Sequence, residues 1–140
     1  MRTAAITRTT RETDITLTLT LDGSGKTSLS TGIGFFDHML DALCRFGQLD
    51  LALTCRGDLH VDAHHTVEDV GICLGRAIRD ALGDRAGIRR AASAYMPMDE
   101  ALAFAALDIS GRPYLVFDAE FAAPMCGQFD TQLAEEFFRA

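Results

Sequence analysis

Apolar and polar residues alternate in the first half of the chain with the period of a β-strand. Residues 15–21 alternate strictly between apolar and hydroxyl side chains, and residues 49–55 alternate again. Both stretches are typical of strands with one face against a core, which for 15–21 is the odd-numbered face. Residues 2–9 alternate more loosely. Asp22-Gly23 is a strong hairpin signal, so residues 26–30 are predicted to return as the next strand.

Two segments switch to helical spacing. Residues 35–46 place Phe36, Met39, Leu40 and Leu43 on one face, with a stop at Gly47. Residues 64–82 form a longer pattern that Gly83 closes. Its apolar positions are Val67, Val70, Ile72, Leu74, Ala77, Ile78 and Ala81.

The order of elements restarts after Gly87. Strands are predicted at 91–96, 101–109 and 113–121, and a helix at 131–140. The two copies share almost no residue identity, so the repeat is a hypothesis about element order. It predicts two half-domains, 1–88 and 89–140, each with strands followed by a helix. The second copy is expected to be incomplete, with Phe137 and Phe138 left little to pack on.

Composition narrows the function classes. The formal charge is −7, which disfavours nucleic acid as a partner. No apolar run approaches membrane-spanning length, and residues 1–8 do not form a signal peptide. The four cysteines form no CxxC pair, as expected for free thiols in a reducing compartment. These features predict a cytoplasmic protein with no membrane partner.

One loop has residues of a phosphate-binding motif. Gly25-Lys26-Thr27 resembles the end of a P-loop, but Thr20 stands where that motif requires a glycine. The loop also joins two predicted strands rather than a strand and a helix. Both features disfavour a P-loop.

The histidines suggest a metal site. All four lie between His38 and His65, and the chain reads HHTVED from His64 to Asp69. Glu68 is four residues from His64 and three from His65, so it lies near both on a helix. Adjacent histidines point about 100° apart, which suits two ions better than one. The ligand types suit Mn, Fe, Zn or Ni, and the spacing excludes the HExxH metalloproteases. The alternative is ordinary capping or solvated histidines.

Two arginines are candidates for anion binding. Arg90 and Arg112 each lie near a predicted turn, and either guanidinium has the geometry to fork a phosphate. A solvated surface arginine is the alternative for each.

These motifs together resemble the imidazoleglycerol-phosphate dehydratases. The matching strings follow the family's order and spacing along the whole chain, at residues 8–14, 21–26, 30–40, 57–62, 64–69, 81–84, 97–102 and 108–113. The resemblance implies a duplicated α+β fold of the kind found in domain 2 of ribosomal protein S5, in which each half-domain is a mostly antiparallel sheet backed by helices. It also implies dehydration of D-erythro-imidazole glycerol phosphate to imidazole acetol phosphate in histidine biosynthesis.

The resemblance implies roles for individual residues. His38, His64, His65 and Glu68 match metal ligands, in a family that binds Mn²⁺ at two sites. Glu12, His38, His64, Arg90 and Arg112 match substrate-contacting positions, with the two arginines near the phosphate. Glu12 and Glu68 are the candidate carboxylates for proton transfer, and the sequence leaves open which of them acts. The family assembles into large symmetric homo-oligomers with active sites between subunits.

The chain departs from the family pattern in two places. Phe46 stands where the family usually has histidine, eight residues after His38. A second HHxxE motif does not occur before Ala140, so a C-terminal truncation is expected. The alternatives to an active dehydratase are a metal-binding, self-associating fragment without catalysis, and a non-catalytic remnant.

Overall fold

The structure is a computed structural model that describes residues 1–140. Two compact units divide the chain: residues 1–83 with 117–140, and residues 84–116. The predicted division into half-domains 1–88 and 89–140 stays a prediction. No helix has the length and apolar character that crossing a membrane requires.

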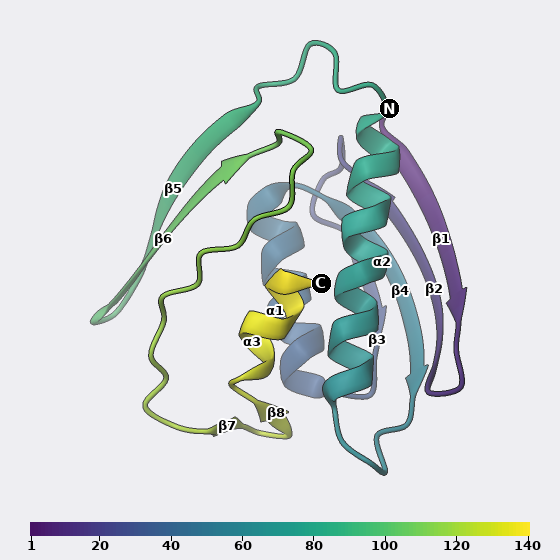
Figure 1. The fold of residues 1–140 in the computed structure, drawn as a ribbon, viewed down its shortest axis with the longest axis vertical. Helices are drawn as coiled ribbons and strands as arrows, with labels where there is room; N and C mark the ends of the chain where they lie inside the picture. Colours follow the sequence, from purple (N-terminus) through teal and green to yellow (C-terminus); the bar gives the residue numbers. More distant parts are fainter. The chain divides into compact units, whose positions relative to one another are not determined.

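A four-stranded sheet forms the frame of the first unit. Its strands are β1 (Thr3–Thr9), β2 (Thr13–Thr20), β3 (Thr27–Ser30) and β4 (Asp50–Gly57), in the order β1-β2-β4-β3 (Figure 1). β2 pairs antiparallel with β1 and with β4, while β3 pairs parallel with β4. The odd-numbered buried face predicted for this strand is confirmed, because Ile15, Leu17 and Leu19 are fully buried.

The expected hairpin between β2 and β3 is wrong. Both edges of β2 are occupied by β1 and β4, so the chain crosses beyond β4 before it pairs. Asp50 holds this crossing loop by accepting hydrogen bonds from the backbone N–H groups of Ser24, at 2.7 Å, and Lys26, at 2.9 Å. A Cβ at Gly23 would lie 2.4 Å from the Asp50 nitrogen, so the loop needs glycine there.

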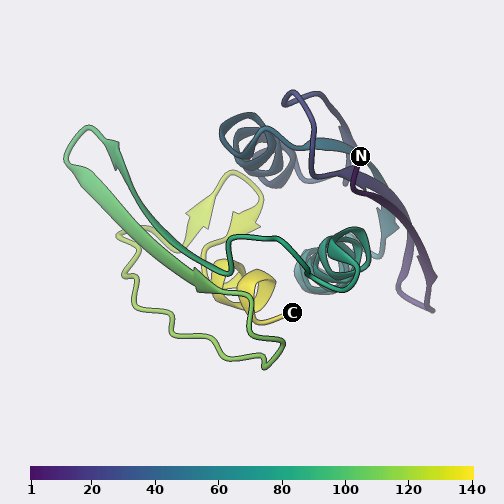
Figure 2. The same ribbon diagram turned by 90° about the horizontal axis from the view of Figure 1, so that it is seen from above.

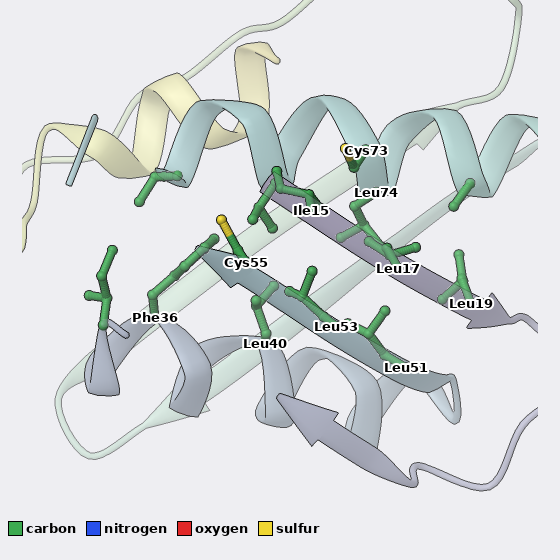
Figure 3. Packing of buried hydrophobic residues seen from close by; sticks show 14 of the residues in the cluster. Ile15, Leu17, Leu19, Phe36, Leu40, Leu51, Leu53, Cys55, Cys73 and Leu74 are labelled. Atoms are coloured by element: carbon green, nitrogen blue, oxygen red, sulfur yellow. The ribbon is translucent and has the colours of Figure 1, made fainter. Parts of the chain in front are cut away.

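Two helices cover one face of this sheet. They are α1 (Gly34–Gly47) and α2 (His64–Leu82), and both lie on the same side of β1 to β4 (Figure 2). Leu51, Leu53 and Cys55 of β4 join β2 in facing the helices. Figure 3 shows these side chains between the strands and residues of both helices, among them Phe36, Leu40, Cys73 and Leu74. Full burial of such a side chain contributes about 1.5–3 kcal/mol, so this layer is the main source of stability in the unit.

The buried face of α1 differs in part from the predicted face. Phe36 and Leu40 are buried as expected, and Cys44 completes the stripe. Met39 and Leu43 flank this stripe and are 48% and 44% exposed. Sequence spacing did not separate them from the buried residues, because the apolar face of α1 is wider than its buried part.

The second unit contains the hairpin of β5 (Ala91–Met98) and β6 (Ala101–Asp108). Every residue of both strands is exposed. The predicted strand at 113–121 is wrong, since this segment has no strand assignment. Its apolar alternation is not enough for a strand without an adjacent strand to hydrogen-bond.

The last segment of the first unit has a small hairpin and a short helix. These are β7 (Met125–Cys126), β8 (Phe129–Asp130) and α3 (Leu133–Arg139). Phe137 does find packing, contrary to expectation, because its ring meets Phe36 edge-on at 5.6 Å between centroids. Phe138 stays 62% exposed, as expected. The α+β class, with antiparallel sheets backed by helices, is confirmed.

Candidate active site

The candidate ligands lie at the first turn of α2. The helix begins at His64, whose backbone N–H donates to Asp62 at 2.8 Å. His64 and Glu68 share a face as predicted, with 3.9 Å between His64 Nε2 and Glu68 Oε2. Both side chains are nearly half exposed. The pair is accessible to a ligand from outside the chain.

The neighbouring His65 points to a different partner. Its Nδ1 lies 2.9 Å from Asp58 Oδ2. The hydrogen bond to this carboxylate is the main cause that raises the pKa of His65, with smaller contributions from the charges of Glu12 and Asp62. A histidine whose Nδ1–H donates to a carboxylate presents Nε2 outward, which is the usual arrangement of a metal-binding imidazole.

Asp58 is a site residue that the sequence analysis missed. It follows directly after the end of β4 and precedes His65 by seven residues, so no helical or strand period connects the two. The contact depends on a close approach of this loop to α2. A Cβ at Gly57 would lie 1.9 Å from Thr66 Oγ1, so glycine is required where β4 ends.

Glu12 lies in the tight turn between β1 and β2. Its backbone N–H donates to Thr10 Oγ1 at 3.1 Å, and its side chain is partly buried. The charge of Glu12 acts on His65, which brings this acid into the neighbourhood of the HHTVED helix. The expected roles of Glu12, as a substrate-contacting acid and a candidate for proton transfer, stay predictions.

His38 is placed separately on α1. It is exposed, and its ring lies 6.4 Å from Phe35 between centroids. No group of three or more His, Cys, Asp or Glu side chains lies together as a metal-binding set in this chain. The sequence-predicted ligands therefore fit a divalent cation in kind, as imidazole nitrogen and carboxylate oxygen, but not in number within one chain.

A cavity of about 420 Å³ opens beside His64. Phe117 and Phe121 line one part of it, and the carboxylates of Asp118, Glu135 and Glu136 line another. A small molecule could reach His64 through this cavity from the side of α3.

The two candidate arginines belong to the second unit. Arg90 makes a two-pronged ion pair with Asp108, with Nε–Oδ1 at 2.6 Å and Nη2–Oδ2 at 3.0 Å. This pairing raises the pKa of Arg90 and lowers that of Asp108. Arg112 is bonded only through its backbone N–H, to Ser110 Oγ at 3.2 Å, so its exposed guanidinium stays available.

Comparison with known proteins gives a consistent answer. Residues 31–140 match the family described as imidazoleglycerol-phosphate dehydratase. The dehydratase of Acidiphilium cryptum is 65% identical over 139 residues, which cover 99% of this chain and 71% of that protein. The dehydratase of Ruminiclostridium cellulolyticum is 58% identical over 140 residues, which cover 100% and 72%.

Solved structures agree with these relatives. The chain is similar to the dehydratase of Staphylococcus aureus with a TM-score of 0.86 and 36% identity, covering 98% of this chain and 75% of that one. It is similar to the Pyrococcus furiosus enzyme with a TM-score of 0.81 and 36% identity, covering 96% and 70%. Since the family match spans most of the chain and the fold matches as well, the chain belongs to the imidazoleglycerol-phosphate dehydratase family.

Proposed function

We propose that this chain is a lyase that dehydrates D-erythro-imidazole glycerol phosphate to imidazole acetol phosphate in histidine biosynthesis, with manganese as its metal. The reaction itself rests on the family match and on relatives that carry the dehydratase name. The choice of manganese and the residue roles rest on the resemblance to the family, and the geometry at the start of α2 supports the ligand roles of His64, His65 and Glu68. No observation favours the alternative of a non-catalytic fragment.

The contact between His65 and Asp58 is the observation that carries the metal proposal. It fixes one imidazole with Nε2 outward, while His64 and Glu68 offer a second nitrogen and a carboxylate on another side of the helix. His64, His65 and Glu68 would hold the metal, with His38 as a further ligand. Manganese would supply Lewis-acid stabilisation of negative charge on the imidazole ring of the substrate.

A partner subunit is part of this proposal. One chain does not bring three candidate ligands together, although His38, His64 and His65 are each exposed or partly exposed. Ligands from two chains would complete a site for each ion, which makes the functional form a homo-oligomer. Metal binding would then also stabilise the assembly through mass action.

The carboxylates move protons in the proposed reaction. Glu68 lies beside His64 and suits the role of a metal ligand, whereas no side chain donates to the carboxylate of Glu12. We assign Glu12 the removal of the proton from carbon. The neighbouring hydroxyl takes up a proton from the carboxylic acid so formed and leaves as water, and the enol that remains tautomerises to the ketone of the product.

The phosphate of the substrate needs a cationic anchor. Arg112 is the better candidate, because its guanidinium is free while Arg90 is paired with Asp108. Arg90 would contribute by releasing Asp108 when phosphate binds. An anchored phosphate holds the glycerol chain in register with the reacting carbons.

We also propose a cytoplasmic location. All four cysteines are free, and three of them are buried, as is typical of proteins in reducing compartments.

The test is turnover of imidazole glycerol phosphate by the 140-residue chain at increasing Mn²⁺ concentration. Imidazole acetol phosphate should form, and its rate should saturate with Mn²⁺. His65→Ala should raise the Mn²⁺ concentration for half-maximal rate by roughly tenfold or more, since even indirect partners of metal ligands cost 10–100-fold in affinity. His60→Ala is the matched control, because His60 is exposed in the preceding loop.

Two results would contradict the proposal. A folded chain that forms no product at saturating Mn²⁺ would exclude the activity. Equal Mn²⁺ dependence for His65→Ala and His60→Ala would exclude His65 as a ligand.

A further inference from the structure

The turn that holds Glu12 is closed by threonine hydroxyls. Thr10 N–H donates to the Thr13 carbonyl at 2.8 Å. Thr10 Oγ1 accepts from the backbone N–H groups of Glu12, at 3.1 Å, and Thr13, at 2.9 Å. The two hydroxyl oxygens of Thr10 and Thr13 lie 3.2 Å apart. The backbone around Glu12 is therefore set by these two side chains.

Asp69 is the common acceptor beneath this turn. Its Oδ2 accepts the hydroxyl of Thr13, and its Oδ1 accepts Nε and Nη2 of Arg8 at 3.1 and 2.8 Å. Thr13 is 3% exposed and Asp69 is 7% exposed, so the contact is shielded from water. Asp69 thereby connects β1, β2 and α2 at one point.

The carboxylate also fixes the direction of the hydrogen bond between the two threonine hydroxyls. An ionised carboxylate only accepts, so the single hydroxyl hydrogen of Thr13 must go to Asp69. Thr13 Oγ1 is then an acceptor for the hydroxyl hydrogen of Thr10. Thr10 Oγ1 accepts from the two backbone N–H groups, which can only donate. Asp69 is thus connected through two hydroxyl groups to the backbone of Glu12.

We infer that Asp69 is a positioning residue, which holds the turn carrying Glu12 against the helix that carries His64, His65 and Glu68. Asp69 follows Glu68 directly in the sequence. Any shift of Asp69 relative to β2 would move Glu12 relative to the candidate metal ligands. The inference rests on the role proposed for Glu12, but its structural part is testable without activity.

Asparagine at position 69 is the informative substitution. The amide keeps the shape of the carboxylate but presents one acceptor and one donor group. It can accept from Arg8 or from Thr13, but not from both. Asp69→Asn should therefore loosen the turn without removing a buried volume.

The first measurement is amide hydrogen exchange by NMR in the metal-free chain. In Asp69→Asn, exchange at Glu12 and Thr13 should become about tenfold faster, as expected for a lost hydrogen bond to a charged group. The amide of Leu17 in the same strand should change little. Thr13→Val should reproduce the effect, and Thr13→Ser should restore normal exchange.

Thr9→Val provides the matched control. Thr9 Oγ1 donates to Asp14 Oδ1 at 2.9 Å across the same hairpin, but on its exposed side. This variant should leave exchange at Glu12 and Thr13 unchanged. Unchanged exchange in Asp69→Asn, or an equal increase in Thr9→Val, would overturn the inference.

The second measurement is a double-mutant cycle on turnover. Asp69→Asn should lower kcat about tenfold with little change in KM, and should lower it no further in a Glu12→Gln background. An equal fall in both backgrounds would mean that Asp69 only supports general stability, which contradicts the inference. If Glu12→Gln itself leaves kcat unchanged, the role proposed for Glu12 fails, and the exchange data alone decide whether Asp69 holds the turn.

Discussion

At the residue scale, the protonation and the orientation of the His65 imidazole depend on its contact with Asp58. Asp58 accepts from Nδ1 at 2.9 Å and stabilises the protonated imidazole, so the pKa of His65 is raised. The same contact has two opposite consequences. It orients Nε2 for a metal, and it makes the proton a stronger competitor for that nitrogen.

The pH dependence of His65 follows from this contact. Because the folded pKa lies above the unfolded value, the contact stabilises the fold fully below the unfolded pKa, and this contribution is lost as pH rises through the folded pKa. Asp58→Asn should lower the pKa of His65, measured by NMR titration of the metal-free chain. Asp62→Asn is the control and should lower it less, since Asp62 acts only through its charge. Equal shifts would mean that the hydrogen bond is not formed in solution.

At the element scale, the pattern of apolar residues predicted where helices and strands form better than it predicted which strands pair. The alternation of β2 identified its buried face, and the period of α2 identified that helix, because both are properties of adjacent residues. Pairing of β3 with β4 is set by which strand edges are already occupied. The contacts of Asp58 with His65, and of Asp69 with Thr13, join segments of unrelated period. These contacts could therefore be identified only from the fold and not from the sequence.

Helix α1 offers a matched pair of leucines. Leu40 is 2% exposed in the core, and Leu43 is 44% exposed at the edge of the buried stripe. Leu40→Ala should lower the free energy of unfolding by about 2–5 kcal/mol, from lost burial and the cavity left behind. Leu43→Ala should change it by less than about 0.5 kcal/mol. Urea unfolding of the metal-free chain measures both. A large loss in Leu43→Ala would show that a partner subunit covers that face.

At the scale of the whole molecule, the two units differ in how they are stabilised. The first unit has a core shared by its sheet and helices. In the second unit, β5 and β6 expose every residue, including Tyr95 and Phe104, whose rings are tilted by 41° with 4.9 Å between centroids. An isolated two-stranded hairpin is marginally stable in water. We therefore expect unequal local stability along the chain.

Trypsin should detect this difference. Arg85, Arg89 and Arg90 are exposed and outside any helix or strand, in the segment that leads into β5. Arg56 is also exposed, but its backbone is held in β4 opposite Asp14. Proteases cleave where the backbone opens easily, so the first internal cuts should follow the three arginines before β5, well before any cut after Arg56. Mass spectrometry of the early fragments identifies the order. Cleavage after Arg56 at the same rate would mean that the sheet opens as readily as the segment before β5, and the difference in stability between the units would be refuted. If Mn²⁺ slows cleavage at Arg85 to Arg90 in the unaltered chain but not in His65→Ala, the proposed metal-dependent assembly covers the second unit.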